Sequence, residues 1–300
     1  MKAKFAAFRA AASVRRVPLV ASPYLLCLML AACASGGGGG GTPLAVGTKG
    51  VYYGDQVQGE TVTTLESVPY NTPMPLNDAV AVDYHWDTGE ISAHSGGEGT
   101  ITTAEDGSMR LEFSSATKTI SGVAGSNSQY LDQWGSFTGL EYSDYGYWID
   151  DSMSDRTTLV YAAVGVETNP ANLPKSGSAT FTGQAVGYRG LEGNALFFDG
   201  DLALNANFAT AAVNGGITNA QVNNTPFNPI GLSGTISSNG FSGSAVTEIA
   251  PSGATHAMPA GVSGTFSGTF YGPAANEVAG TVKILESGTS GLAAAFGAKR

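Results

Sequence analysis

From Gly177 to its C-terminal end, the sequence alternates between two kinds of side chain with a period of two. Between Val262 and Gly272, the even-numbered positions are apolar or glycine, and the odd-numbered positions are Ser, Thr or Tyr. Successive side chains of a β-strand point to opposite faces, so this pattern predicts a strand that is buried on one face. Eight segments show it: 179–187, 196–208, 212–222, 232–236, 241–245, 262–272, 278–284 and 292–298.

Glycine alternates with large apolar residues on the buried face of these segments, which indicates a strongly curved sheet that closes on itself. We therefore expect an all-β chain whose C-terminal part is a closed eight-stranded antiparallel β-barrel. A barrel of eight strands is filled by side chains or holds one small ligand. The aromatic content favours a filled interior, occupied by Phe181, Phe208, Phe266, Phe270 and Phe296. The Asn239-Gly240 pair predicts a two-residue hairpin turn between two of the strands.

The N-terminal segment has the layout of a secretion signal. Residues 1–16 carry only positive charge, and residues 17–32 form an uncharged apolar run that ends in small residues. The run closes with Leu30-Ala31-Ala32-Cys33, which resembles the bacterial lipobox. We predict that residues 1–32 are a signal peptide, and that Cys33 is acylated and begins a glycine-rich tether over residues 33–42. The alternative is an ordinary signal peptide with an incidental cysteine.

The predicted lipid anchor bears on location and on the type of barrel. The residue after Cys33 is Ala34, which favours the outer membrane over retention in the inner membrane. A transmembrane barrel would place its apolar side chains outside. The lipid anchor and the lack of regular aromatic girdles favour a soluble barrel.

Residues 43–168 are less regular and predict a smaller antiparallel β domain, which we term the handle. Alternating pieces appear at 51–53, 61–65, 79–84, 100–103, 109–113 and 158–166. Near its end, aromatic residues lie among acids, and this set is our candidate for ligand binding: Trp134, Tyr142, Tyr145, Tyr147 and Trp148. Binding surfaces are rich in tyrosine and tryptophan, but the same side chains are also common in cores.

Charge and motifs exclude several functions. The chain has 14 basic and 24 acidic residues, and five of the basic ones lie in the first sixteen positions. Without that segment the net charge is −15, so phosphate backbones repel the chain, and we expect no non-specific binding of nucleic acid. The catalytic motifs of common hydrolases and nucleotide-binding enzymes are absent, and we attribute the S-x-x-K match at Ser115 to Lys118 to chance. We therefore expect a protein that is not an enzyme.

The three histidines form no cluster with metal-ligand spacing. His85 and His94 flank a turn, and His256 lies beside Met258 in a loop between two strands. We interpret each as a solvated loop histidine. The alternative is haem binding, with His256 or Met258 as the axial ligand. No other cofactor and no metal site are predicted.

Three motifs of the C-terminal half resemble transferrin-binding protein B and its single-lobed relatives. They are Gly177-Ser-Ala-Thr-Phe-Thr-Gly183, then Gly268-Thr-Phe-Tyr-Gly-Pro273 with Glu277 and Gly280 following, and the terminal Ala295-Phe-Gly-Ala-Lys299. The resemblance implies a handle domain followed by an eight-stranded barrel over residues 177–300. It also implies a surface lipoprotein with one lobe, moved across the outer membrane by a lipoprotein translocator. Ligands in that family include host transferrin, haem or haemoglobin, and complement factor H.

Two functions follow from this sequence. The first is an outer-membrane surface lipoprotein that captures a host iron-carrying or haem-carrying ligand for nutrient uptake. The alternative is a structural or immune-evasion lipoprotein of the envelope with no iron ligand.

Overall fold

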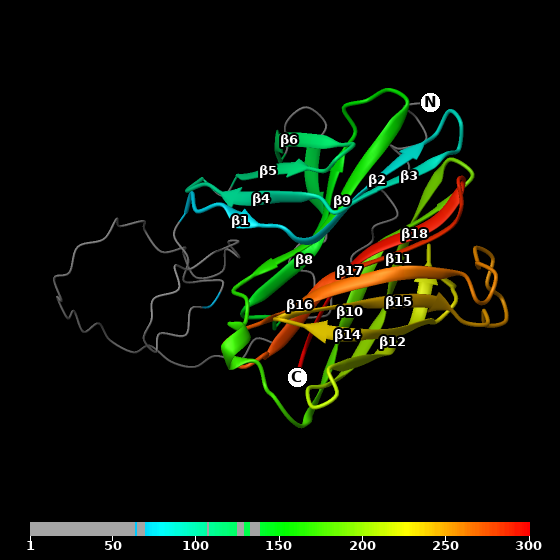
Figure 1. Ribbon diagram of the computed structural model, residues 1–300. Coiled ribbons are helices and arrows are strands. Elements are labelled where there is room, and N and C mark those ends of the chain that lie inside the picture. The colour runs from blue at the N-terminus through cyan, green and yellow to red at the C-terminus, as the bar shows by residue number, and fades with distance from the viewer. Residues whose placement is uncertain (1–63, 65–69, 107, 125–128, 133–138) are drawn as a thin grey trace, which may run out of the picture. The chain divides into compact units, whose positions relative to one another are not determined.

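The computed structural model describes residues 64, 70–106, 108–124, 129–132 and 139–300 (Figure 1). The predicted signal peptide, Cys33 and the glycine-rich tether lie outside the described residues. So do Trp134, the predicted strand at 51–53 and all but one residue of the predicted strand at 61–65. In the described part of the chain there is no α-helix, and no helix has the length and hydropathy needed to span a membrane.

The C-terminal half is a closed antiparallel barrel, as the alternation predicted. Its eight strands, in ring order, are β10 (Ser178–Leu191), β11 (Asn194–Asn207), β12 (Ala212–Val222), β14 (Ile230–Ser237), β15 (Gly240–Thr247), β16 (Ser263–Tyr271), β17 (Glu277–Ser287) and β18 (Ser290–Lys299). The ring closes because β10 pairs with both β11 and β18. The short β13 (Thr225–Pro226) extends the edge of β12. Each predicted strand falls on an observed one.

The barrel interior is packed with aromatic rings. The five predicted phenylalanines are all buried there, with Phe198, Phe227 and Phe241 in addition. The Phe270 ring lies 5.2 to 5.9 Å from the ring centroids of Phe181, Phe208 and Phe241. Gly268 pairs with Gly280 across β16 and β17, and a Cβ at Gly268 would lie 2.4 Å from the Phe241 ring. Glycine therefore alternates with phenylalanine because the rings occupy the space that other side chains would fill.

One predicted turn is displaced by a residue. Ser237 pairs with Gly240, so the two-residue turn is Ser238-Asn239 and not Asn239-Gly240. The Asn239 amide donates to Glu167 Oε2 at 2.7 Å, and the Asn239 carbonyl accepts the N–H of Phe270 at 2.8 Å. Ser238 takes the left-handed conformation, with φ of 55°. These contacts with Glu167 and Phe270 hold Asn239 in the turn, and Gly240 begins the next strand.

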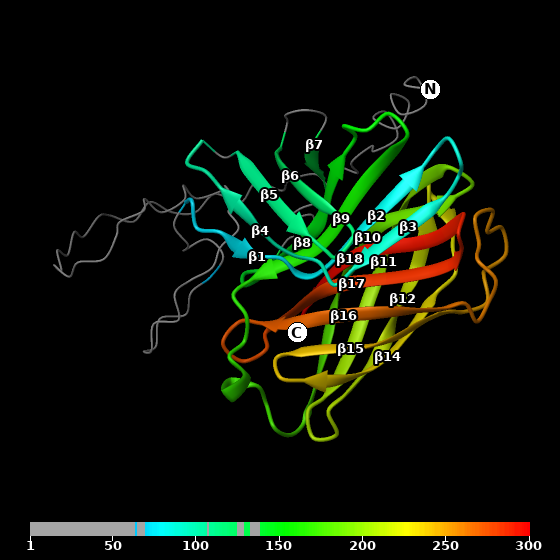
Figure 2. The same ribbon diagram turned by 45° about the horizontal axis from the view of Figure 1, so that its top comes forward.

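The handle consists of two antiparallel sheets packed face to face (Figures 1 and 2). The smaller sheet contains, in order, β1 (Met74–Pro75), β4 (Glu98–Thr103), β5 (Met109–Ser114) and β6 (Thr119–Val123). The larger contains β3 (Ile91–Ser95), β2 (Asn77–His85), β9 (Arg156–Gly165), β8 (Ser143–Asp150) and β7 (Gln129–Asp132). The sequence pattern predicted β2, β4, β5 and β9, and it missed β1, β3, β6, β7 and β8.

The larger sheet is buried on both faces. One face forms a core with the smaller sheet that includes Trp148 and Phe113. The other face packs on β10, β17 and β18 of the barrel, where the barrel presents small residues such as Ala279, Ala293 and Ala295. A Cβ at Gly297 would lie 2.3 Å from the Tyr145 ring, so glycine is required there for the sheet to approach. The linker to the barrel runs through a short 3₁₀ helix, η3 (Pro170–Asn172).

Candidate ligand-binding face

The predicted aromatic binding set does not form an exposed surface. Tyr145, Tyr147 and Trp148 each have 0 % exposure, because β8 lies between the small sheet and the barrel. Strand alternation directs Tyr145 and Tyr147 toward the barrel and Trp148 toward the small sheet. Tyr142, just before β8, is half-buried. The expectation that this set is accessible to a ligand is therefore wrong for Tyr145, Tyr147 and Trp148, which are core residues.

The residues considered for haem are placed differently from one another. Met258 is 3 % exposed and belongs to the barrel core, so its thioether is not available as an axial ligand. His256 is half-buried, and its carbonyl accepts the guanidinium Nε–H of Arg189 at 3.4 Å. Among the described residues, no group of three or more His, Cys, Asp or Glu side chains is arranged to hold a metal ion.

His85 and His94 are paired with acids, which corrects the expectation of solvated loop residues. His94 lies within β3, where Nε2 is 3.2 Å from Asp83 and Nδ1 is 2.7 Å from the hydroxyl of Thr117. His85 ends β2, with Nδ1 4.0 Å from Asp155.

The S-x-x-K match forms a turn between β5 and β6. Its Ser115 hydroxyl accepts the N–H of Lys118 at 3.1 Å, and Lys118 Nζ donates to Asp83 at 2.8 Å. Burial by itself would raise the pKa of the Asp83 carboxyl. The Lys118 ammonium, with hydrogen bonds from Thr158 and His94, outweighs burial, so the pKa lies below its usual value.

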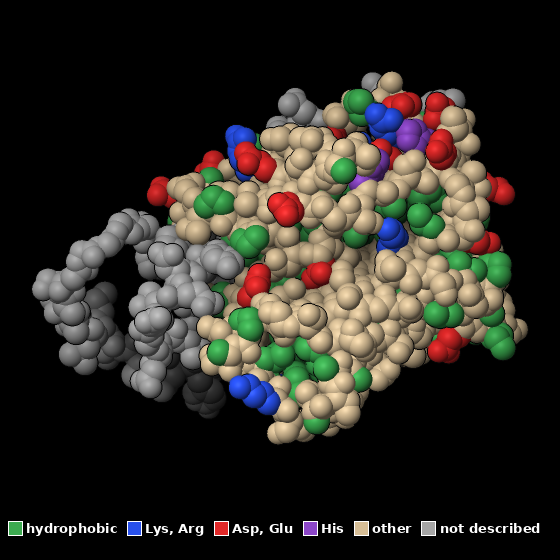
Figure 3. Space-filling model, in the orientation of Figure 1, with side chains coloured by type: hydrophobic (Ala, Val, Ile, Leu, Met, Phe, Trp, Pro, Cys, Tyr) green, Lys and Arg blue, Asp and Glu red, His purple; other side chains and the backbone are tan. Residues whose placement is uncertain are grey.

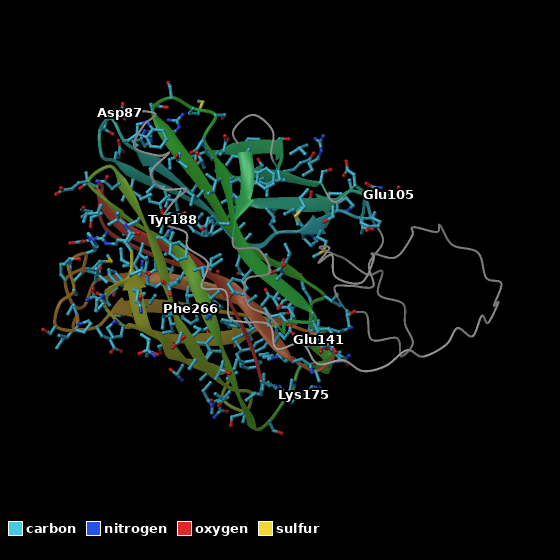
Figure 4. All side chains as sticks on the ribbon, turned by 180° about the vertical axis from the view of Figure 1, so that it is seen from behind. Asp87, Glu105, Glu141, Lys175, Tyr188 and Phe266 are labelled. Atoms are coloured by element: carbon cyan, nitrogen blue, oxygen red, sulfur yellow. The ribbon has the colours of Figure 1, made fainter. Side chains whose placement is uncertain are left out.

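Turns from the handle and the barrel meet at one end of the barrel, and we call this surface the loop face. It comprises residues 86–90, 151–155, 192–193, 248–262 and 288–289. Figure 4 labels Asp87 at this end and Glu141 at the opposite end. The N–H of Ile91 donates to the Gly288 carbonyl at 2.6 Å, so the handle turn is fixed to the β17–β18 turn.

The handle part of the loop face is held by Trp86. Its indole Nε1–H donates to the carbonyl of Ser154 at 3.1 Å, and its backbone N–H donates to the backbone carbonyl of Asp155 at 3.2 Å. Gly89 and Gly193 both have positive φ, and a Cβ at Gly193 would lie 3.3 Å from the Trp86 carbonyl oxygen. Glycine therefore allows the handle turn and the barrel turn to approach each other closely.

The long loop 248–262 is fixed at its base and exposed at its tip. The buried amide of Asn228 donates to the carbonyls of Glu248 and Met258 and accepts the Met258 N–H at 2.8 Å. The Thr247 hydroxyl donates to the Pro259 carbonyl at 2.7 Å. Between these anchors, Ile249 is 82 % exposed.

The loop face combines exposed apolar side chains with acids. Three large hydrophobic side chains are exposed in the described part of the chain, Met153, Ile249 and Leu285, and all lie in or beside these turns. The exposed acids of the face are Asp87, Glu90, Glu192, Glu248 and Glu286. Beneath them the buried Arg189 donates to Glu286 at 3.1 Å, and burial lowers the pKa of its guanidinium although Glu286 opposes the shift. The surface is suited to a macromolecule that presents basic and apolar groups.

The sequence pattern predicted only part of the loop face. It placed His256 and Met258 in a loop between strands, but it did not indicate that this loop would lie at the same end of the barrel as the β2–β3 turn of the handle (Figure 1). The signal that was present is the cluster of Pro251, Gly253 and Pro259 without alternation, which is typical of an irregular loop.

These features define a lobe with a two-sheet handle, a filled eight-stranded barrel and a composite loop surface at one end. Residues 173–300 match the family model described as the C-lobe and N-lobe β-barrels of Tf-binding protein B. The barrel of this chain is therefore similar to the barrels of that family, as the sequence motifs predicted. No curated protein matches the sequence.

Several solved structures are similar to this chain. A transferrin-binding protein B mutant from Haemophilus parasuis is 18 % identical, with a TM-score of 0.42 over 69 % of this chain and 54 % of that one. The isotype 1 protein from Neisseria meningitidis is 17 % identical, with a TM-score of 0.43 over 70 % and 52 %. The N-lobe of lactoferrin-binding protein B from Moraxella bovis is 12 % identical, with a TM-score of 0.40 over 75 % and 100 %. The chain spans about half the length of the first two.

Proposed function

We propose that this protein is an outer-membrane surface lipoprotein that captures a macromolecular ligand through its loop face, and that it is a binding protein and not an enzyme. The observation that carries the proposal is that the exposed Met153, Ile249 and Leu285 all lie in or beside turns at one end of the barrel, where acids are also exposed. Exposed apolar groups surrounded by polar ones are typical of protein interaction sites. The filled barrel interior leaves the outer surfaces for binding.

The membrane attachment rests on the sequence. The lipobox-like Leu30-Ala31-Ala32-Cys33 supports acylation of Cys33, and the glycines that follow would let the lobe stand away from the lipid. Export to the cell surface would require a lipoprotein translocator, as the barrel family implies. We place the protein on the outer membrane with its lobe exposed at the cell surface.

The candidate ligand is a host iron-carrying protein. Proteins similar to this one are described as transferrin-binding and lactoferrin-binding proteins. The acidic loop face would favour a basic patch on such a ligand, both in the rate of association and in orientation. Haem itself is a weaker candidate, because Met258 is buried and the barrel is filled.

A serum pull-down tests the proposal. The bait is the chain without residues 1–32 and with Cys33→Ser, immobilised and exposed to host serum, with transferrin, lactoferrin and haemoglobin as purified competitors. A second bait carries Ile249→Asp, which adds charge at an exposed tip. The control bait carries Ala209→Asp, an exposed position in the β11–β12 turn at the other end of the barrel.

We expect one iron-carrying protein to be retained by the first and control baits and lost by the Ile249→Asp bait. Retention of a serum protein that none of the competitors displaces would favour the immune-evasion alternative. Retention of nothing would favour a structural envelope lipoprotein.

A further inference from the structure

A second concave site lies between the handle and the barrel, away from the loop face. Residues 78–80 and the β3–β4 turn at residues 95–98 line one side of this cleft. The outer faces of β15, β16 and β17 line the other side. The cleft has a volume of about 600 Å³. Sites for small molecules commonly have volumes of about 300–1,000 Å³. On the face drawn in Figure 3, the surface over these barrel strands is mostly polar and uncharged.

Hydroxyl groups are the most numerous polar side-chain groups of the cleft wall. Five of the lining side chains carry one: Ser95, Ser242, Thr265, Ser267 and Thr281. A hydroxyl both donates and accepts hydrogen bonds, so a wall of hydroxyls matches a ligand whose own groups do the same. Phe266 also lines the cleft, but its side chain is 2 % exposed and belongs to the barrel core. The Phe266 ring is therefore not available to stack against a flat hydrophobic ligand such as haem.

The cleft contains more acidic than basic side chains. Asp78 and Glu98 are acidic and Lys283 is basic, and the Lys283 ammonium already donates to the Ser95 hydroxyl. A single cation opposed by two carboxylates disfavours an anion such as phosphate. Since the described residues also contain no metal-binding cluster, a neutral hydroxylated molecule is the class of ligand that fits best.

Asp78 has an unusual backbone conformation for a strand residue. It has φ of 56°, in the left-handed region, and it lies in an irregularity of β2 where the register shifts between Asn77 and Val80. Bulges and strained residues of this kind are concentrated beside functional sites. The Thr269 hydroxyl donates to Asp78 Oδ2 at 3.2 Å, and the Thr281 hydroxyl donates to the Asp78 carbonyl at 2.7 Å. Side chains of the barrel thus hold this handle residue in the left-handed conformation.

Asp78 is also held at a cost to stability. Burial raises the pKa of its carboxyl to about 6, against hydrogen bonds from Ser267 and Thr269 that lower it. At neutral pH the ionised carboxylate is therefore less favourable in the folded protein than in the unfolded chain. A half-buried carboxylate that lowers stability and lines a cleft with hydroxyl groups is suited to accept hydrogen bonds from a ligand.

We propose that this cleft binds a neutral saccharide, with Asp78 accepting hydrogen bonds from sugar hydroxyls and the serine and threonine hydroxyls completing the contacts. The site is independent of the loop face, so it can fail or succeed without affecting the proposed capture of a macromolecule.

Saturation-transfer difference NMR tests the proposal with a panel of neutral mono-, di- and trisaccharides of glucose, galactose, mannose and N-acetylglucosamine at millimolar concentration. The protein is the chain without residues 1–32 and with Cys33→Ser. Asp78→Asn removes the charged acceptor and tolerates the left-handed conformation. Ser242→Trp fills the cleft from an exposed position. Asp201→Asn, an exposed carboxylate on the outer face of β11, is the matched control.

We expect at least one saccharide to give transfer signals, with Asp78→Asn weakening its affinity tenfold or more and Ser242→Trp abolishing binding. Asp201→Asn should leave the affinity unchanged. The proposal is overturned if no saccharide of the panel binds, if binding survives Asp78→Asn and Ser242→Trp, or if inorganic phosphate binds in the saccharides' place. A normal far-ultraviolet circular dichroism spectrum for each variant separates these outcomes from misfolding.

Discussion

The carboxylate of Glu277 accepts both the backbone N–H and the hydroxyl of Ser143, at 2.9 and 2.8 Å, although 134 positions separate the two residues. The same carboxylate accepts the N–H groups of Glu141 and Tyr142. Glu277 begins barrel strand β17 and is 3 % exposed, while residues 141–143 lead into handle strand β8. One buried side chain therefore satisfies three backbone donors of the handle. Burial raises the pKa of Glu277 against these four hydrogen bonds.

Replacing Glu277 should loosen the handle from the barrel. Glu277→Ala leaves three N–H groups without their acceptor, of which the Ser143 N–H is buried, and an unsatisfied buried donor costs about 1–3 kcal/mol. We expect the free energy of unfolding in urea to fall by about 1–3 kcal/mol. Glu141→Ala is the control, because its exposed side chain can be removed while its N–H remains. Equal unfolding midpoints for the two variants would contradict the role of Glu277.

The carboxyl of Asp78 should make stability depend on pH. Its pKa is raised from 3.8 to about 6, so between these values the folded protein holds a proton that the unfolded chain has lost. Stability then falls as pH rises through this window, by up to about 3 kcal/mol for a shift of this size. Asp78→Asn should recover most of that amount at pH 7 and little at pH 4.

Urea unfolding of wild type and Asp78→Asn at pH 4, 5, 6 and 7 measures this effect, with Asp201→Asn as the control for removal of one negative charge. Glu167 adds repulsion to the Asp78 carboxylate, and Ser267 and Thr269 oppose it through hydrogen bonds. A difference between wild type and Asp78→Asn that is the same at all four pH values would show that the carboxyl is not perturbed.

Replacing buried tyrosines of the handle with alanine should lower the stability of the folded protein. Tyr145→Ala removes a ring that is fully buried against Gly297, and loss of a large core side chain costs about 3–5 kcal/mol. Thermal unfolding followed by circular dichroism should show a clear decrease in Tm. Tyr142→Ala, at a half-buried position, should have a smaller effect. A Tyr145→Ala protein as stable as wild type would contradict the assignment of Tyr145 to the core and would favour an accessible aromatic surface.

The filled barrel makes a similar prediction at Phe266. The ring centroids of Phe266 and Phe241 lie 6.0 Å apart. Phe266→Ala should lower the free energy of unfolding by about 3–5 kcal/mol. Ile249→Ala, at an exposed position of the loop face, should have little effect on stability. An unchanged melting temperature for Phe266→Ala would argue against a packed interior.

Acylation is tested by fractionation of cells. Cys33→Ser should move the protein from the membrane fraction to the soluble fraction, because the lipid is attached at that thiol. Cys27→Ser should leave it in the membrane fraction, since Cys27 is within the predicted signal peptide. Detergent partitioning of Cys33→Ser that matches wild type would mean that the anchor lies elsewhere.

The sequence predicted the barrel far better than the handle, and the reason is burial. Barrel strands such as β11 face solvent on one side, so their residues alternate visibly. Strand β8 is buried on both sides, so its tyrosines and tryptophan follow no such alternation and resembled a surface cluster. The glutamate at position 277 was visible as part of a motif, but its partners at 141–143 depend on how two distant segments pack. The role of Asp78 depends on a bulge that no local pattern indicates.

The central claim, that a macromolecular ligand binds at the loop face, is tested most directly by hydrogen–deuterium exchange. The lipid-free chain is compared alone and in complex with the serum protein that the wild-type bait retains. We predict slower exchange of backbone amides in residues 86–90, 151–155 and 248–262 of the complex, with unchanged exchange in the β11–β12 turn at residues 208–211. Protection confined to the β11–β12 turn or to other surfaces of the barrel, with the loop face unchanged, would contradict the account.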